Sequence, residues 1–103
     1  MSSLIRVARV EDFLPGLARR VEARDHDIAL WRVDARFFAV GNICAHHHMP
    51  VLHQGVLEDL TVTCPMHGWT YHLETGCAVE GSGRVPTYPV HVTEGWVVVE
   101  VPD

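Results

Sequence analysis

Two short motifs hold the side chains best suited to bind a metal. They are CAH at positions 44–46 and CPMH at positions 64–67, with 17 residues between the first histidine and the second cysteine. Each motif offers one thiol and one imidazole, so together they supply two sulfur and two nitrogen ligands. This mixture of soft and borderline ligands suits either zinc or an iron–sulfur cluster. The candidate ligands are Cys44, His46, Cys64 and His67.

The spacing of the ligands bears on which metal they bind. Zinc ribbons and zinc fingers usually pair two like ligands within one motif, whereas each motif here mixes cysteine with histidine. In a cluster of two irons, such mixing lets each loop give its cysteine to one iron and its histidine to the other. Two neutral imidazoles in place of two thiolates would raise the reduction potential, because less negative charge surrounds that iron. A zinc site remains open at this point.

The elements that must position these ligands are predicted to be short β-strands. Runs rich in β-branched and aromatic residues, bounded by turn signals, predict strands at residues 28–33, 36–40, 60–63, 69–73, 88–93 and 96–101. Two-residue connections at 34–35 and 94–95 predict hairpins. Residues 17–24 contain good helix formers but also alternate, and we interpret them as a strand; residues 11–14 are predicted to form a single helical turn. The sequence therefore predicts one all-β domain over residues 1–103, an antiparallel sandwich or barrel with the motifs in two loops.

Composition narrows the possible partners and surroundings. The formal net charge is −5, there is no lysine and the arginines are scattered, so no basic stripe indicates nucleic-acid binding. An acidic surface would favour docking to a basic patch on a partner protein. No apolar run approaches the roughly 20 residues that span a bilayer, and the N-terminus lacks a signal-peptide pattern, which predicts a cytoplasmic protein without a membrane segment. The odd number of cysteines, Cys44, Cys64 and Cys77, argues against a disulfide framework.

The two motifs and their surroundings resemble a known family. CAH followed by CPMHGW resembles the C-x-H and C-x-x-H signature of the Rieske [2Fe–2S] proteins. The longer stretches VTCPMHGWTYHLETGCA and YPVHVTEGWVVVEV extend the resemblance over nearly the whole chain. It is strongest to the free-standing Rieske ferredoxins of aromatic-ring dioxygenase systems, and the chain is also similar to the small subunit of assimilatory nitrite reductases.

The resemblance implies a role for each ligand. Cys44 and Cys64 would hold the buried iron of one Rieske-type [2Fe–2S] cluster per chain, and His46 and His67 would hold the outer iron near the surface. Gly68 would let backbone N–H groups approach the cluster, where a larger residue might block them. His47 would then be an exposed neighbour of the ligands rather than a ligand itself.

Several positions depart from the pattern of the high-potential relatives. Met49 and Met66 replace the cysteines that form a disulfide there, and we interpret them as apolar cover over the cluster. Trp69 replaces a serine that donates a hydrogen bond to the cluster, whereas Tyr71 is retained near a ligand sulfur. These features predict a potential towards the low end of the Rieske range, roughly −150 mV. His48, where relatives often have glycine, is either a harmless surface substitution or an added titratable group.

Three further expectations concern residues outside the ligand set. Cys77 is expected to be a buried thiol, and Trp31 and Trp96 are expected in the core. Residues 81–86 match the loop that covers the cluster in the family, but a plain surface turn accounts for them equally well.

The resemblance implies a one-electron carrier between a flavin reductase and a terminal oxygenase. The chain is too short for a separate mononuclear iron site and lacks a nucleotide-binding glycine motif, so it would transform no substrate itself and would act as a monomer. A small subunit of a nitrite reductase complex, with a permanent partner, is the second hypothesis. A zinc-binding or cluster-free interaction module is the third.

Overall fold

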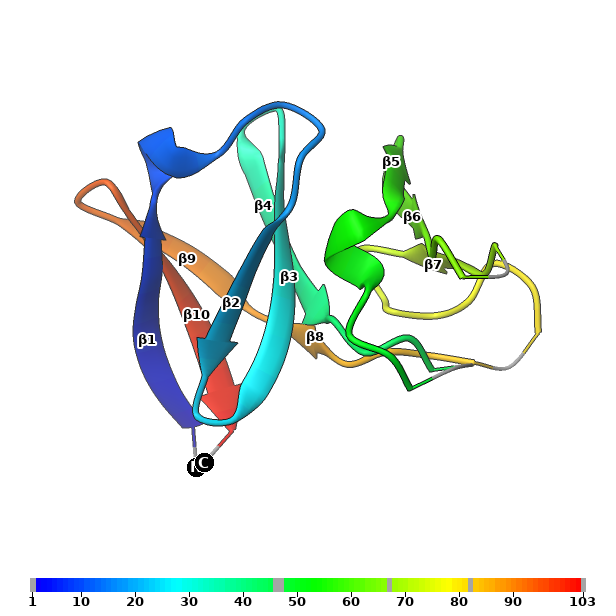
Figure 1. Cartoon of the computed structure of the whole chain (residues 1–103). Helices are drawn as coiled ribbons and strands as arrows, with labels where there is room; N and C mark the ends of the chain where they lie inside the picture. The colour runs from blue at the N-terminus through cyan, green and yellow to red at the C-terminus, as the bar shows by residue number, and fades with distance from the viewer. Residues whose placement is uncertain (1, 46–47, 67, 82, 103) are drawn as a thin grey trace.

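The computed structural model describes residues 2–45, 48–66, 68–81 and 83–102. Over these residues the chain forms three antiparallel sheets and two short 3₁₀ turns, η1 (Val10–Asp12) and η2 (Leu52–Gln54), with no α-helix. Figure 1 shows two sheets packed into a framework and the third set to one side of it with its loops. We call residues 2–41 and 87–102 the framework and residues 42–86 the lobe.

The first framework sheet is built by strands from both ends of the chain. It holds β1 (Ser2–Arg9), β10 (Trp96–Pro102) and β9 (Val90–Thr93), in that order. The predicted hairpin between the last two strands is confirmed, and its turn residues Glu94 and Gly95 have φ values of 52° and 81°. Strand β1 was not predicted, although its partly buried Ile5 and Val7 alternate with exposed residues.

The second framework sheet is the central layer of the molecule. It holds β2 (Arg19–Ala23), β3 (His26–Val33), β4 (Arg36–Gly41) and β8 (Thr87–Tyr88), in that order. The strands predicted at 17–24, 28–33 and 36–40 and the turn at 34–35 are confirmed. The single strand predicted at 88–93 is wrong in one respect: it divides at Pro89 into β8 and β9, which lie in different sheets. Proline has no N–H to continue a ladder, so the chain changes sheets there.

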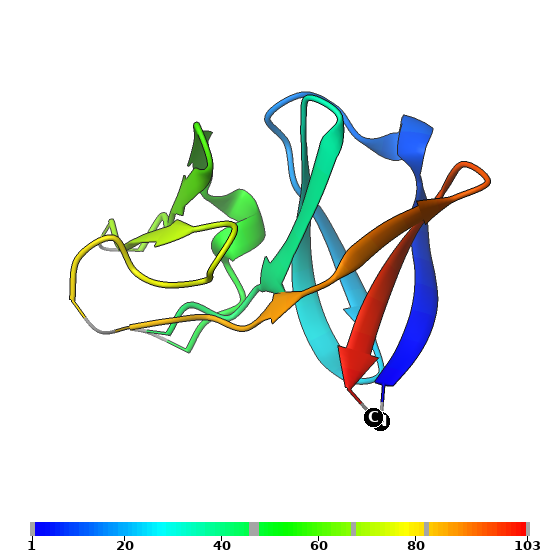
Figure 2. The ribbon, with the colours of Figure 1, turned by 180° about the vertical axis from the view of Figure 1, so that it is seen from behind.

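The lobe is a small three-stranded sheet with its connecting loops. It holds β5 (Val56–Glu58), β6 (Thr61–Thr63) and β7 (Thr70–His72), in that order. The strands predicted at 60–63 and 69–73 are confirmed as β6 and β7, whereas β5 was not predicted. Both views show the lobe beside the end of the framework where β4 and β8 meet it, with its loops pointing away from β1 (Figures 1 and 2).

The central sheet is buried on both faces, which creates two cores. On β3, Ile28 and Leu30 pack with Val97 and Val99 of the first sheet, while Ala29 and Trp31 pack against the lobe. Alternate residues of one strand therefore serve different cores. The described strands form open sheets packed face to face, so the sandwich alternative is correct and no closed barrel forms. The described residues include no helix long and apolar enough to cross a membrane.

Candidate metal centre

The second motif lies in a tight connection between β6 and β7. The backbone N–H of Cys64 donates to the carbonyl oxygen of Trp69 across 2.6 Å, which closes the loop (64–69) at its base. The hydroxyl oxygens of Thr63 and Thr70 lie 2.9 Å apart on the two strands just outside it. The strands therefore fix both ends of the connection. His67 lies outside the described residues.

The first motif lies in a loop that leaves β4. The backbone N–H of Cys44 donates to the carbonyl oxygen of Met49 across 2.9 Å, and the N–H of His48 donates to the carbonyl oxygen of Cys44 across 2.7 Å. His48 is exposed and has a φ of 58°, in the left-handed region that glycine adopts most easily. A glycine would adopt this backbone conformation without the strain that a side chain brings. His46 and His47 lie outside the described residues.

The cysteines of the two loops are buried together. Cys44 is 0% exposed and Cys64 is 1% exposed, both within the core between the central sheet and the lobe. The Tyr71 hydroxyl lies 3.4 Å from Cys44 Sγ, which confirms the predicted nearness of this tyrosine to the sulfur of a candidate ligand. Burial raises the pKa of the Cys64 thiol, and a hydrogen bond with Cys44 raises it further, against an opposing bond from the Met66 backbone. Burial also raises the pKa of Tyr71, to about 12, and the hydrogen bond with Cys44 contributes to the same increase.

This environment fits a metal cluster. Thiolates are the metal-binding form of cysteine, and burial here disfavours a bare thiolate at Cys64, so its negative charge needs a compensating cation. A cation that binds both sulfurs supplies that compensation, since ligand deprotonation and metal binding are coupled. No disulfide joins these two cysteines. Of the predicted ligand set, the described residues place the two cysteines side by side, as two ligands of one site require.

Asn42 fixes the first loop to the framework. It is the buried polar residue of the described chain, 0% exposed. Its side-chain nitrogen donates to Asp27 Oδ1 across 3.0 Å and to the carbonyl oxygen of Pro50 across 3.1 Å. Its side-chain oxygen accepts from the backbone N–H of His53 across 2.6 Å and lies 3.1 Å from His53 Nδ1. Arg20 completes the network by donating to both Asp27 oxygens.

Sequence reasoning missed Asn42, although a signal was present. Asn42 directly follows Gly41, and this dipeptide by itself indicates only a turn. An amide two residues before a ligand cysteine can bond to both strand and loop, because it carries donors and an acceptor. His53, a candidate for an ordinary polar role by its sequence position, contacts the Asn42 side chain through its ring.

Residues 78–86 return alongside both loops. The backbone N–H of Val79 donates to the carbonyl oxygen of Thr70 across 2.8 Å. A Cβ at Gly83 would lie 3.0 Å from Trp69 Cζ3 and 3.9 Å from the Ala45 Cβ, so this glycine passes close to both loops. The position of Gly83 favours the covering role over the plain surface turn for this segment. Ser82 lies outside the described residues.

Two expectations about single residues are wrong. Cys77 is exposed rather than buried, because it forms an isolated bridge with Arg84 in which its side chain faces solvent. Trp96 is only partly buried and lies under Arg6 and Arg9, whose guanidinium carbons are 5.5 Å and 4.8 Å from its ring centroid. Trp31 is fully buried as expected.

Gly68 has a φ of 75°, in the left-handed region that L-residues rarely adopt, which favours glycine at this position. Apart from its chain neighbours, a Cβ here would meet none of the described residues within 4 Å. Met66 packs partly buried against the core of the lobe, whereas Met49 is 42% exposed.

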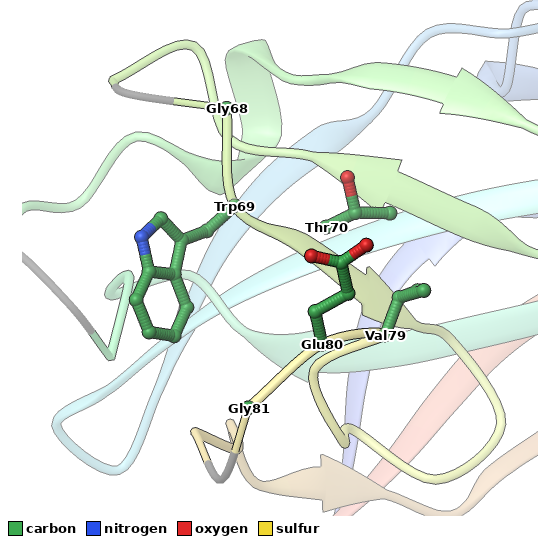
Figure 3. Close-up of a pocket in the computed structure, with 6 residues that line it drawn as sticks. All are labelled: Gly68, Trp69, Thr70, Val79, Glu80 and Gly81. Atoms are coloured by element: carbon green, nitrogen blue, oxygen red, sulfur yellow. The ribbon is translucent and has the colours of Figure 1, made fainter.

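A pocket opens beside the second loop. It has a volume of about 510 Å³, and its described lining residues are Gly68, Trp69, Thr70, Val79, Glu80 and Gly81. Figure 3 shows the Glu80 carboxylate directed into the space between Trp69 and Thr70.

A β-sandwich that carries two loops with adjoining buried thiols is an arrangement typical of a small metal-binding domain. A family model for the Rieske [2Fe-2S] domain matches residues 3–89. The 3-phenylpropionate/cinnamic acid dioxygenase ferredoxin subunit of Photorhabdus laumondii is 40% identical over 104 residues, covering 98% of this chain and 96% of that one. The chain belongs to the Rieske [2Fe–2S] domain family, and its cofactor is a [2Fe–2S] cluster of the Rieske type.

Solved structures agree on the fold. A nitrite reductase small subunit from Mycobacterium tuberculosis has a TM-score of 0.93 and 25% identity, covering 100% of this chain and 98% of that one. A chain from a complex of reduced oxygenase and oxidised ferredoxin in carbazole 1,9a-dioxygenase has a TM-score of 0.85 and 29% identity, covering 93% of this chain and 91% of that one. Both resemble this chain over nearly their whole length.

Proposed function

We propose that this chain is a ferredoxin that carries single electrons from a flavin-dependent reductase to a terminal oxygenase of an aromatic-ring dioxygenase system. The observation that carries the proposal is the 40% identity, over 98% of the chain, to a dioxygenase ferredoxin subunit. The similarity to a chain from an oxygenase–ferredoxin complex supports an oxygenase as the acceptor. A flavin-dependent donor and a monomeric state are part of the proposal.

We assign four ligands to the cluster. Cys44 and Cys64 bind through their buried sulfurs, and His46 and His67 complete the set. The adjoining burial of the two cysteines supports the first pair, and the C-x-H and C-x-x-H spacing supports the second. When bound, the cluster supplies one-electron redox chemistry.

The surrounding residues hold and shield the ligands. The bond from the Cys64 N–H to the Trp69 carbonyl closes the second loop, and the bond from the Cys44 N–H to the Met49 carbonyl braces the first. The Tyr71 hydroxyl, 3.4 Å from Cys44 Sγ, is placed to donate to that sulfur when it is a thiolate. The covering segment near Gly83 limits access of water to both loops. The whole chain acts as one domain and transforms no substrate.

The second candidate is a small subunit of a nitrite reductase-like complex. It is favoured by the TM-score of 0.93 over the full chain with a subunit of that kind. The two candidates differ in partner, because a subunit would remain bound to its large subunit through purification. Isolation as a free chain that reduces an oxygenase would exclude this candidate.

The decisive experiment combines spectroscopy with electron transfer. The purified protein should contain about two irons per chain and, after dithionite reduction, give the EPR spectrum of a mixed cysteine–histidine cluster. A Cys64→Ser variant should lose that spectrum. A colourless protein with one zinc per chain would instead support a structural zinc site. Reduction of a separately purified dioxygenase oxygenase through the protein, with a flavin reductase and NADH, tests the carrier role itself.

A further inference from the structure

The pocket beside the second loop is lined by one charged side chain among the described residues. Of the described residues that line it, only Glu80 carries a charge, and Trp69 presents an aromatic ring to the same space (Figure 3). No described residue forms an ion pair with Glu80. The pocket therefore offers a carboxylate that is available to a group from outside.

Two glycines keep the pocket open. A Cβ at Gly68 or at Gly81 would meet nothing within 4 Å among the described residues beyond its chain neighbours, so both positions leave room in the pocket. Their φ values of 75° and 82° favour glycine, which preserves the opening. A side chain entering from solvent thus meets main chain rather than a crowded surface.

The walls of the pocket are held in place by the backbone. The Val79 N–H bonds to the Thr70 carbonyl across 2.8 Å, and the Cys64 N–H bonds to the Trp69 carbonyl across 2.6 Å. Gly83 passes within close contact of the Trp69 ring on another side. Because these bonds exist before any partner arrives, little ordering is needed when the pocket is filled.

A carboxylate beside an indole ring selects a cation. A guanidinium or ammonium group can pair with the carboxylate and stack on the ring at the same time. The chain has a formal net charge of −5, so its field attracts a basic partner surface. Val79, 49% exposed at the rim, adds an apolar contact suited to the alkyl stem of a lysine or arginine.

We propose that this pocket receives an arginine or lysine side chain of the electron acceptor and so anchors the acceptor beside the second loop. The inference rests on the proposed function, because the acceptor is the terminal oxygenase. It adds to that function a named contact and the charge of the group that makes it.

The test compares three variants of the holoprotein. Glu80→Gln removes the charge with little change of shape, and Glu80→Lys reverses it. Glu58→Gln is the matched control, because Glu58 is also exposed and lies on β5, the edge strand of the lobe sheet remote from β7. Binding of each oxidised variant to the oxidised oxygenase is measured by calorimetry at low and high salt, and the midpoint potential of each is measured by voltammetry.

We expect Glu80→Gln to weaken binding by about three- to tenfold at low salt, and Glu80→Lys to weaken it more. The loss should shrink at high salt, where screening weakens the pair in the wild type as well. Glu58→Gln should bind as the wild type does. Neutralising Glu80 also removes negative charge near the cluster and can shift the midpoint potential. Binding is therefore measured directly, so that an effect on docking is distinguished from an effect on the driving force of electron transfer.

Equal binding by Glu80→Gln, Glu58→Gln and the wild type would overturn the pocket proposal and leave the proposed function standing. An equal loss in both Gln variants would also overturn it, because the effect would then be one of net charge. If the wild type binds no oxygenase, the proposed function fails, and the same variants are compared against a nitrite reductase large subunit. A loss there confined to Glu80 would support the pocket, and no difference would reject it.

Discussion

The side-chain nitrogen of Asn42 donates a hydrogen bond to Asp27 Oδ1 across 3.0 Å, and this bond joins the first loop to strand β3 of the framework. The same amide also bonds to Pro50 and His53 at the far side of the loop. One buried side chain therefore links strand β3 to the far side of the first loop.

Replacing Asn42 should loosen the first loop. Asn42→Ala leaves the Pro50 carbonyl and the His53 N–H without their partner, and we expect a loss of about 2–4 kcal/mol in the free energy of unfolding. It should also speed cluster loss, measured as bleaching of the visible absorption under a chelator. Val99→Ala, in the other core, should cost a similar 2–3 kcal/mol. Equal rates of cluster loss in the two variants would contradict a specific role for Asn42.

The stability of the protein should fall as the pH drops below 6.5, partly through His53. Burial lowers the pKa of His53 below 6.5, and the positive charge of Arg20 lowers it further while Asp27 opposes. The unfolded chain therefore takes up a proton at a higher pH than the folded one. The contribution of neutral His53 to the free energy of unfolding is fully present above pH 6.5. It is lost as the pH falls towards the pKa of His53 in the folded protein.

The measurement is thermal unfolding of the holoprotein between pH 5 and pH 7.5. His53→Gln should show a shallower fall in this window than the wild type. The control is His91→Gln, on exposed strand β9, which should keep the wild-type slope. If His53→Gln and the wild type have parallel profiles, His53 does not contribute to the acid sensitivity.

Tyr71→Phe should lower the midpoint potential. The hydroxyl lies 3.4 Å from Cys44 Sγ, and a donor to that sulfur stabilises the more negative reduced state. A hydrogen bond of about 1 kcal/mol corresponds to about 40 mV for one electron. We expect a shift of that order below a wild-type value of roughly −150 mV. An unmoved midpoint would assign Tyr71 to packing alone.

Two glycines with the same backbone conformation should respond differently to alanine. Gly76 and Gly68 have φ values of 77° and 75°, so both pay a similar strain of about 1 kcal/mol as alanine. A Cβ at Gly76 would lie 2.0 Å from the Val85 carbonyl oxygen, whereas one at Gly68 would meet nothing within 4 Å. Gly76→Ala should therefore cost at least about 2 kcal/mol more in unfolding free energy. Chemical denaturation measures both losses of unfolding free energy. Equal losses in the two variants would contradict a steric requirement for glycine at position 76.

The strands of the central sheet were predictable because local sequence determines them. Residues 28–33 and 36–40 are apolar runs on either side of a two-residue turn, and the pairing Val33↔Arg36 closes that hairpin. The ligand motifs were equally visible, since their residue types and spacing are local. The burial of Cys44 and Cys64 followed from the resemblance.

Features that depend on distant neighbours were not predictable. Strand β1 is defined by pairing with β10 at the other end of the chain, and its own pattern includes a register shift between Arg6 and Ala8. The exposure of Cys77 depends on which way one residue faces in an isolated bridge. Asn42 gains its importance from Asp27, Pro50 and His53, whose proximity only the folded chain reveals.

The lobe leaves the framework and returns to it at a single point. The Gly41 N–H bonds to the Pro86 carbonyl across 2.8 Å, and a Cβ at Gly41 would lie 2.8 Å from Pro86 Cγ. Strands β4 and β8 then pair directly, Val40 opposite Thr87. The lobe is thus an insertion whose two chain ends meet at one hydrogen-bonded pair, so its loops can differ in length without a change at the junction. Removal of the lobe would nevertheless expose Ala29 and Trp31 of β3, so the framework and the lobe depend on each other for a complete core.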